Sequence, residues 1–286
     1  MADKKKITKD VTPRMIKIAG FSELVKNSAY LIYRHKKSLG GITLVYAALY
    51  FIFIMGFSLT SSMGSAVDPS ASKISQTGTM LSYAISNMYN GNSQSDAIVL
   101  TQLLLFLISA MAVIWATSKL KQGKDVKVLD SFYQGTARLV STLVVCAVLV
   151  LAMIPALLSS AFLSVSLRSS GSSMESVVIF IVSAVILFFA LLLLSMLWPA
   201  FYISVEGKTR PIKSLKASIA LTKNRRSKIL GRLILLFLLL LALFFVTLYF
   251  FAMISTALIP YVLFITAFGI FIFSQVYLYE LSRSLG

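Results

Sequence analysis

The sequence has few of the side chains that carry out most enzyme chemistry. Its 286 residues include one cysteine and one histidine. Cys146 lies in an apolar run without a partner cysteine, so an internal disulfide is excluded and a packing role is favoured over a reactive thiol. His35 lies in the run Arg34-His35-Lys36-Lys37, where neighbouring cations disfavour a metal ion.

Recognisable catalytic motifs are also missing. The chain contains no Walker loop, no Gly-x-Ser-x-Gly and no His-Glu-x-x-His. Its ten acidic residues all fall outside the central parts of the apolar runs, and no two of them form a spaced metal-ligand motif. We therefore expect no enzyme activity, no cofactor and no metal site.

Charge is scarce, and one sign dominates it. Only 13% of the residues are charged, about half the usual share of about 25% in soluble domains. The 27 basic residues outnumber the ten acidic ones, for a net charge of +17. The basic residues flank apolar runs and form no separate basic domain. This placement favours anionic lipid headgroups as the counter-charge and argues against nucleic acid.

Long apolar runs are abundant, at 58% hydrophobic residues and a mean hydropathy of +0.86. A membrane span needs about 20 apolar residues. Six runs qualify, near residues 41–61, 98–118, 139–164, 177–202, 229–255 and 258–278. The last two are divided only by a turn near Thr256 and Ala257, because one helix of nearly fifty residues would reach about 75 Å. We predict an all-α polytopic membrane protein with six transmembrane helices arranged as three hairpins.

The distribution of Lys and Arg predicts the direction of these spans. In the six-span arrangement, 25 of the 27 basic residues lie on one side, and only Lys73 and Arg168 lie on the other. Cytoplasmic segments collect Lys and Arg, so we expect a multi-pass protein of the cell membrane with both termini in the cytoplasm. The first apolar run begins only near Ile42, and we expect no cleavable signal peptide. The Ser-, Asn- and Gly-rich residues 62–96 would form a solvated outer loop.

A basic, amphipathic stretch precedes each pair of spans. Residues 21–40 align without a gap on residues 212–231, with six identities that include Ala29/Ala220 and Gly40/Gly231, and residues 129–139 fit more loosely. We interpret the chain as one membrane domain, 1–286, with an N-terminal cytoplasmic segment (1–40), a first hairpin (41–118), a second unit (119–202) and a third unit (203–286). Each hairpin would follow an interfacial helix, and Gly40 and Gly231 would mark the turn into the span. In the alternative, the basic residues serve only as topology signals and the helices continue straight into the spans.

Several residues are candidates for contact or for shaping the helices. Cations placed to reach lipid headgroups or a partner are Arg34, Lys36, Lys37, Lys213, Lys216, Arg225, Arg226 and Lys228. Pro155 is expected to kink its span, because proline frees a helical carbonyl. Ala112 and Ala116 form a small-xxx-small pair suited to close helix contact.

The fourth span and the segment after it resemble a known family. The sequence Trp198-Pro-Ala-Phe-Tyr-Ile-Ser-Val-Glu206-Gly, followed by a basic amphipathic stretch from Pro211 to Lys223, is similar to six-span prokaryotic proteins. These include the membrane domain found beside some glycerophosphodiester phosphodiesterases and related inner-membrane proteins of unknown function. The residues that match the family pattern are Pro199, Glu206, Ser218, Leu221 and Thr222. The resemblance implies the non-catalytic membrane part of that family, and no phosphodiesterase activity.

These observations lead to one main hypothesis and two others. The main one is a non-enzymatic membrane protein that binds anionic lipid, or a membrane or cytoplasmic protein partner, through its basic cytoplasmic face. The alternative is a transporter or export-associated permease for an apolar or lipid-like substrate, which predicts a mid-membrane cavity near Pro155 and Pro199. A lipid-modifying enzyme would need acids gathered around His35 at one interface.

Overall fold

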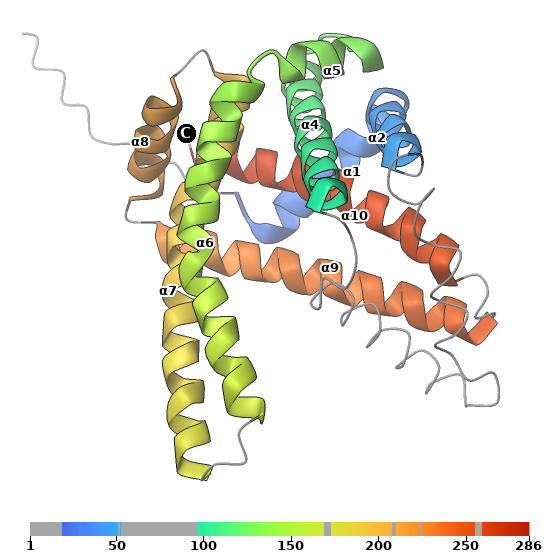
Figure 1. The fold of residues 1–286 in the computed structure, drawn as a ribbon. Coiled ribbons are helices and arrows are strands. Elements are labelled where there is room, and N and C mark those ends of the chain that lie inside the picture. Colours follow the sequence, from blue (N-terminus) through green and yellow to red (C-terminus); the bar gives the residue numbers. More distant parts are fainter. Residues whose placement is uncertain are drawn as a thin grey trace, which may run out of the picture.

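The structure is a computed structural model that describes residues 19–50, 52, 96–168, 173–207, 210–223, 225–254 and 259–285. The secondary structure elements of this part of the chain are helices, and it contains no strand (Figure 1). In order they are α1 (Phe21–Arg34), α2 (Lys36–Tyr50), α4 (Asp96–Lys121), α5 (Val128–Thr136), α6 (Leu139–Arg168), α7 (Ser173–Glu206), α8 (Pro211–Thr222), α9 (Arg226–Ile254) and α10 (Ile259–Arg283). The all-α prediction is therefore confirmed for the described residues.

Five of these helices are long and apolar enough to cross a membrane. The five stretches are Val99–Lys121, Leu139–Ser164, Met174–Glu206, Arg226–Ile254 and Val262–Arg283. They correspond to the second to sixth predicted spans, which confirms these five as apolar helices of spanning length. Helix α2 covers the first half of the remaining predicted span, and the second half lies outside the described residues except for Ile52. The predicted outer loop also lies almost entirely outside them.

Helix α4 lies at the centre of the packed core. Its residues Ala110, Ala112, Val113 and Ala116 are fully or almost fully buried, and they pack with Leu39 and Ile42 of α2 and with Val276 of α10. A second cluster joins α4 to α1, α7, α9 and α10 through large side chains: Leu24, Met111, Ile114, Trp198, Tyr202, Ile229 and Tyr277. Small residues in the middle of α4 allow its neighbours to approach closely.

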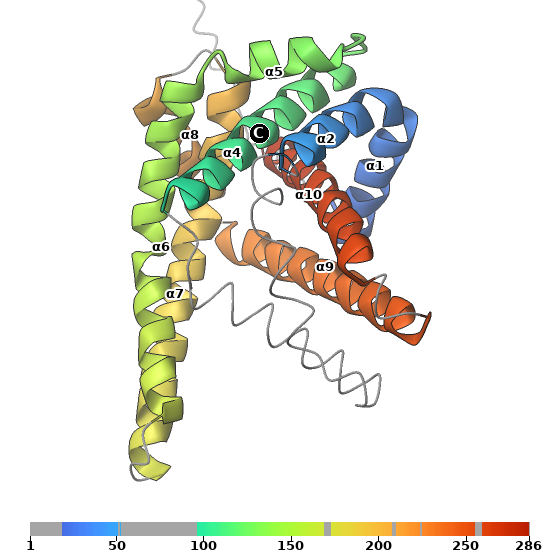
Figure 2. The same cartoon turned by 45° about the vertical axis from the view of Figure 1, so that its right-hand side comes forward.

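Helices α6 and α7 lie side by side along their length and extend away from this core (Figures 1 and 2). The hydroxyl of Ser159 donates to the Ser183 carbonyl at 2.9 Å, and the Ser183 hydroxyl donates to the Ser159 carbonyl at 3.2 Å. Most other side chains in the distal half of this pair are exposed and apolar, including Leu157, Leu158 and Phe188. In Figure 2 the pair diverges from α9 and α10 as it leaves the core.

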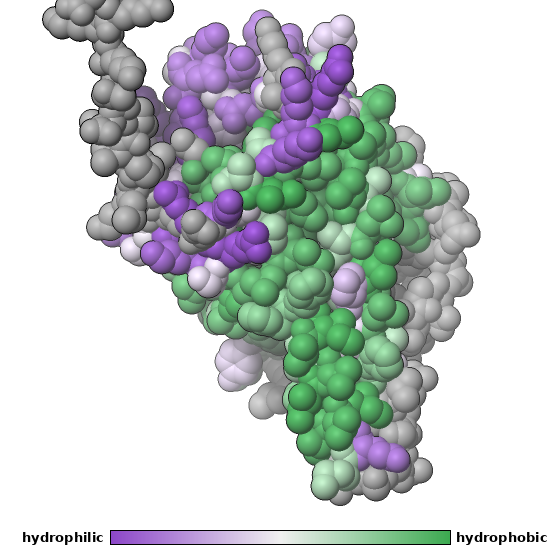
Figure 3. Space-filling model, turned by 90° about the vertical axis from the view of Figure 1, so that its left-hand side faces the viewer, coloured by the Kyte–Doolittle hydropathy of each residue, from purple (hydrophilic) through white to green (hydrophobic). Residues whose placement is uncertain are grey.

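The polar surface is concentrated where several long helices begin or end. Helix α4 ends at Lys121, α7 at Glu206 and α10 at Arg283, and α9 begins at Arg226. We call this region the basic end; it consists of α1, α5 and α8 with residues 36–38, 118–127, 206–207, 225–232 and 279–285. Figure 3 shows hydrophilic residues gathered at one end of the molecule and a mostly apolar surface below them.

Candidate functional site

Three short helices at the basic end each stop just before a longer helix begins. Helix α1 ends at Arg34, and the backbone of the next residue, His35, leaves the helical region (φ −113°, ψ 31°). Helix α8 ends at Thr222, and the next residue, Lys223, is extended (φ −54°, ψ 131°). Both breaks come before the glycines predicted to mark them, since Gly40 lies inside α2 and Gly231 lies inside α9. That prediction is wrong because these glycines keep helical backbone conformations; of the described glycines, only Gly123 has a positive φ, of 75°.

Helix α1 packs on α10 and presents polar and aromatic side chains on its other side. Leu24 and Ser28 are buried, and the Phe21 ring lies 6.0 Å from the Tyr277 ring. Tyr30 and Tyr33 are exposed at 63% and 76%. Helix α1 therefore has one side packed against the protein and an exposed side that carries two aromatic rings.

Helix α5 packs on α4 through a close backbone contact. Gly135 is buried, and a Cβ atom at this position would lie 3.1 Å from the Cα atom of Ala112 and 3.1 Å from the Met111 carbonyl oxygen. Ala112 therefore lies in a close helix contact, as predicted, and its partner is a glycine. On the other side of α5, Leu129 and Tyr133 are 82% and 81% exposed.

Helix α8 packs through hydroxyl groups and turns both apolar and basic residues outward. Ser214, Ser218 and Thr222 are buried on α6 and α7, and the Ser218 hydroxyl donates to the Met196 carbonyl of α7 at 2.6 Å. Small side chains with satisfied hydroxyls allow this close approach. Ile212 and Ile219 are exposed, as are the cations Lys213 and Lys216 beside them.

A polar network joins the ends of α4, α7 and α10. The Ser118 hydroxyl donates to Glu206 Oε1 at 2.8 Å, and the Tyr279 hydroxyl donates to the same atom at 3.1 Å. Arg283 Nη1 donates to the Tyr279 hydroxyl at 3.4 Å. Beside this network, the Lys121 ammonium forms a 2.5 Å ion pair with Glu280. Sequence reasoning identified Glu206 alone among these residues as a candidate.

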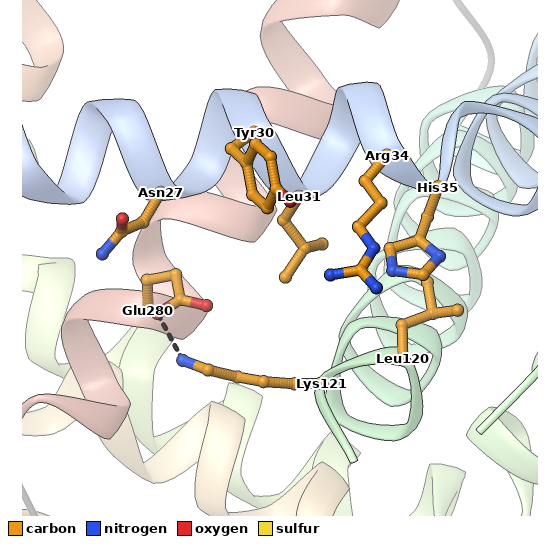
Figure 4. A pocket seen from close by; sticks show the side chains of 8 residues that line it. All are labelled: Asn27, Tyr30, Leu31, Arg34, His35, Leu120, Lys121 and Glu280. Atoms are coloured by element: carbon orange, nitrogen blue, oxygen red, sulfur yellow. Dashed lines mark hydrogen bonds and ion pairs between the residues drawn. The ribbon is translucent and has the colours of Figure 1, made fainter. Parts of the chain in front are cut away.

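A cavity of ≈ 260 Å³ lies between α1, α4 and α10 (Figure 4). Arg34 and His35 line it from the end of α1, and Lys121 and Glu280 line it from α4 and α10. Its remaining lining residues are Asn27, Tyr30, Leu31 and Leu120. Among the described residues, the side chains of Arg34 and His35 form no hydrogen bond or ion pair, whereas Lys121 is paired.

The predicted contact cations lie around the basic end without forming one cluster. Arg34 lines the cavity, and Lys36 and Lys37 are exposed at the start of α2. Arg225 precedes α9, in which Arg226 and Lys228 occupy the exposed first turn. Lys121 and Glu280 could not be grouped with Arg34 from the sequence, because the three residues are far apart along the chain.

The residues of the family pattern have identifiable packing roles. Pro199 is buried inside α7, Glu206 ends that helix, and Ser218, Leu221 and Thr222 lie on α8. Pro155 lies within α6, which continues through it. The cavity described above involves neither proline, so it is not the mid-membrane cavity that the permease hypothesis predicts. Within the described residues, no group of three or more His, Cys, Asp or Glu side chains could hold a metal ion.

Comparisons with known proteins add no further identification. The chain matches no protein-family model, and neither curated proteins nor solved structures show significant similarity to it. The geometry of the basic end is therefore the basis on which a function can be inferred.

Proposed function

We propose that this chain is a non-enzymatic multi-pass protein of the prokaryotic cytoplasmic membrane that binds anionic lipid headgroups through its basic end. The observation that carries the proposal is the outer side of α8, where exposed Ile212 and Ile219 lie beside exposed Lys213 and Lys216. A helix with this surface can bury its apolar side chains at the headgroup boundary while its cations reach phosphate groups.

The other short helices support the same interpretation. Helix α1 exposes Tyr30 and Tyr33 close to Arg34, and the Lys36 ammonium lies 5.5 Å from the centre of the Tyr33 ring. Helix α5 exposes Leu129 and Tyr133. Each Lys or Arg near an anionic surface contributes about 1 kcal/mol, so the combined attraction of the basic end is substantial.

We further propose six spans in three hairpins, each introduced by one of these short helices. Helix α2 and the residues after it would supply the first span, and the five apolar helices the others. The basic end would then face the cytoplasm together with both termini. Under this proposal the short helices lie at the interface, consistent with the breaks that separate them from α2, α6 and α9.

Cysteine labelling tests the orientation. Replacing Cys146, the chain's sole cysteine, with Ala gives a background for single cysteines at Lys124 and Arg168. An impermeant maleimide applied outside intact cells should label position 168 and leave position 124 unlabelled until the membrane is permeabilised. Labelling of position 124 in intact cells would overturn the orientation.

Lipid preference tests the function. The purified protein in a neutral detergent is titrated with phosphatidylglycerol and with phosphatidylcholine at low salt. We expect tighter binding of phosphatidylglycerol, with the preference reduced at least about fivefold in Lys213→Gln/Lys216→Gln. The matched control, Lys73→Gln/Arg168→Gln, removes the same charge from the predicted opposite side and should leave the preference unchanged. Equal affinity of the wild-type protein for the two lipids would contradict the proposal.

A further inference from the structure

The cavity between α1, α4 and α10 has an uneven distribution of charge. At its lower edge in Figure 4, the Lys121 ammonium is directed at the Glu280 carboxylate, and these two charges compensate each other. The Arg34 guanidinium and the His35 ring project from the end of α1 on the other side. Among the described residues that line the cavity, Glu280 is the only acidic one, so Arg34 leaves a positive charge there without a compensating partner among them.

The position of these two basic side chains has a partial explanation without a ligand. Cations near a helix C-terminus are favoured by the helix dipole, and α1 ends at Arg34. The dipole does not explain why the Arg34 guanidinium borders an open cavity that Lys121, from another helix, also lines. A guanidinium presents a planar fork of donors that matches phosphate oxygens.

The position of the cavity along the apolar helices indicates whether a phosphate bound there would belong to a lipid or to a soluble molecule. Lys121 ends the apolar stretch Val99–Lys121, and Glu280 lies within the last turn of Val262–Arg283. The cavity therefore opens at the level where two spans meet the headgroup region. Leu31, Leu120 and Tyr30 add apolar surface to its lining, which suits the glycerol and first acyl carbons of a lipid more than a free ion.

We propose that this cavity binds the phosphate ester of an anionic phospholipid, with Arg34 as its main ligand and His35 and Lys121 beside it. This inference rests on the proposed function and assigns one specific headgroup site within the basic end. The cavity volume of ≈ 260 Å³ lies just below the range of about 300–1,000 Å³ that is typical of small-molecule pockets. The site has room for a headgroup, and the acyl chains would remain in the bilayer.

The test compares two variants of one helix with the same loss of charge. Arg34→Gln removes a cavity residue, and Lys26→Gln removes an exposed cation of α1 that does not line the cavity. The full chain in neutral detergent is titrated by calorimetry with dihexanoyl phosphatidylglycerol, dihexanoyl phosphatidylcholine and glycerol 3-phosphate. We expect the phosphatidylglycerol Kd to rise about tenfold or more in Arg34→Gln and less than about twofold in Lys26→Gln. The Kd of Arg34→Lys should lie between those of wild type and Arg34→Gln, because lysine keeps the positive charge but lacks the planar pair of donors of the guanidinium.

Glu280→Gln provides a change of opposite sign. It removes the carboxylate that competes for Lys121, so binding of phosphatidylglycerol should tighten about threefold. A purely structural role of the Lys121–Glu280 pair predicts no tightening.

The outcomes separate this site from the general proposal. Equal losses in Arg34→Gln and Lys26→Gln would overturn the site and leave lipid binding by the basic end intact. Equal affinity of the wild-type protein for phosphatidylglycerol and phosphatidylcholine would overturn the proposed function itself. Binding of glycerol 3-phosphate as tight as that of the lipid, weakened in parallel by Arg34→Gln, would assign the cavity to a soluble phosphate ester and overturn the lipid assignment.

Discussion

Helices α4 and α7 are both long enough to cross a membrane, yet they have opposite surroundings. The α4 stretch has a mean hydropathy of 2.3, and 44% of the residues in its 18-residue apolar segment are buried. The α7 stretch has a mean hydropathy of 3.4, and only 11% of the corresponding residues are buried. The same contrast holds for α10, with a mean hydropathy of 1.9 and 33% of these residues buried, and α9, with a mean hydropathy of 3.0 and 11% buried. The more apolar helices are therefore the more exposed ones.

The difference follows from the absence of a hydrophobic driving force between helices in lipid. A helix surrounded by acyl chains has to be apolar, whereas a helix surrounded by protein can carry small and polar residues that pack or hydrogen-bond. Helix α4 carries buried Ala112 and Ala116 for close packing, and its Ser118 donates to Glu206. Hydropathy thus predicts which segments are membrane helices. The small and polar residues within such a segment, as in α4, indicate that it lies at the centre of the packed core.

The largest expected effect is at the close contact between α5 and α4. Gly135→Leu would place side-chain atoms where even a Cβ lies 3.1 Å from the Ala112 backbone, and overpacking of this kind costs about 1–3 kcal/mol or more. The expected result is a lower thermal unfolding midpoint in detergent. The control is Gly231→Ala, where no atom lies within 4 Å of the added Cβ; it should leave the midpoint unchanged or raise it. A tolerated Gly135→Leu would show that α5 does not pack on α4.

The next effect separates α4 from α7 with the same substitution. Ala116→Leu enlarges a fully buried side chain and should destabilise the protein by about 1–3 kcal/mol. Ala184→Leu enlarges an exposed side chain of α7 and should be close to neutral. The free energies of unfolding of the two variants test this directly. Equal losses would contradict the assignment of α4 as the central helix.

A smaller effect is expected from the network at the basic end. Ser118→Ala removes a donor to the Glu206 carboxylate, and a hydrogen bond to a charged group contributes about 1.5–3 kcal/mol when it is well shielded. Because Glu206 is exposed and solvent weakens the interaction, we expect Ser118→Ala to lower the free energy of unfolding by about 1 kcal/mol. Ser160→Ala on the exposed side of α6, whose hydroxyl bonds only within its own helix, is the matched control. If the two variants unfold at the same temperature, the network does not stabilise the fold.

The smallest effect is expected where α6 meets α7. Double replacement of Ser159 and Ser183 by Ala removes two reciprocal hydrogen bonds. Interhelical hydrogen bonds in membranes average about 0.6 kcal/mol. Each hydroxyl donates to a backbone carbonyl that the Ala variant retains, so each single replacement should cost about that much, and the two losses should add in the double variant. A loss above about 2 kcal/mol in either single variant would mean that polar contacts, rather than packing, hold these two helices together.

Much of the architecture could be predicted from the sequence because a run of about 20 apolar residues has few alternatives to a membrane helix. The run at residues 139–164 matches the apolar stretch found in α6, and the run at 177–202 lies within that of α7. The prediction that the last run of nearly fifty apolar residues is divided into two helices near Thr256 is confirmed, since α9 ends at Ile254 and α10 begins at Ile259.

The contacts at the basic end could not be predicted in the same way. Hydropathy gives no information on which helix end meets which, so Ser118 and Glu206, or Lys121 and Glu280, show no relation along the chain. The burial of Ser214, Ser218 and Thr222 on α8 also differs from expectation for polar residues, since hydroxyls that bond to helix carbonyls are tolerated in a packed contact. The helix breaks at His35 and Lys223 were displaced from the predicted glycines because a glycine inside a helix costs only about 1 kcal/mol.

The central claim is that the basic end holds anionic lipid. Its most direct test is the composition of the lipid retained when the protein is extracted from a mixed membrane without detergent, in polymer-bounded discs. We expect wild-type protein to retain phosphatidylglycerol or cardiolipin at a fraction above that of the bulk membrane, and Lys213→Gln/Lys216→Gln to lower this fraction. Retained lipid identical in composition to the bulk membrane would contradict it.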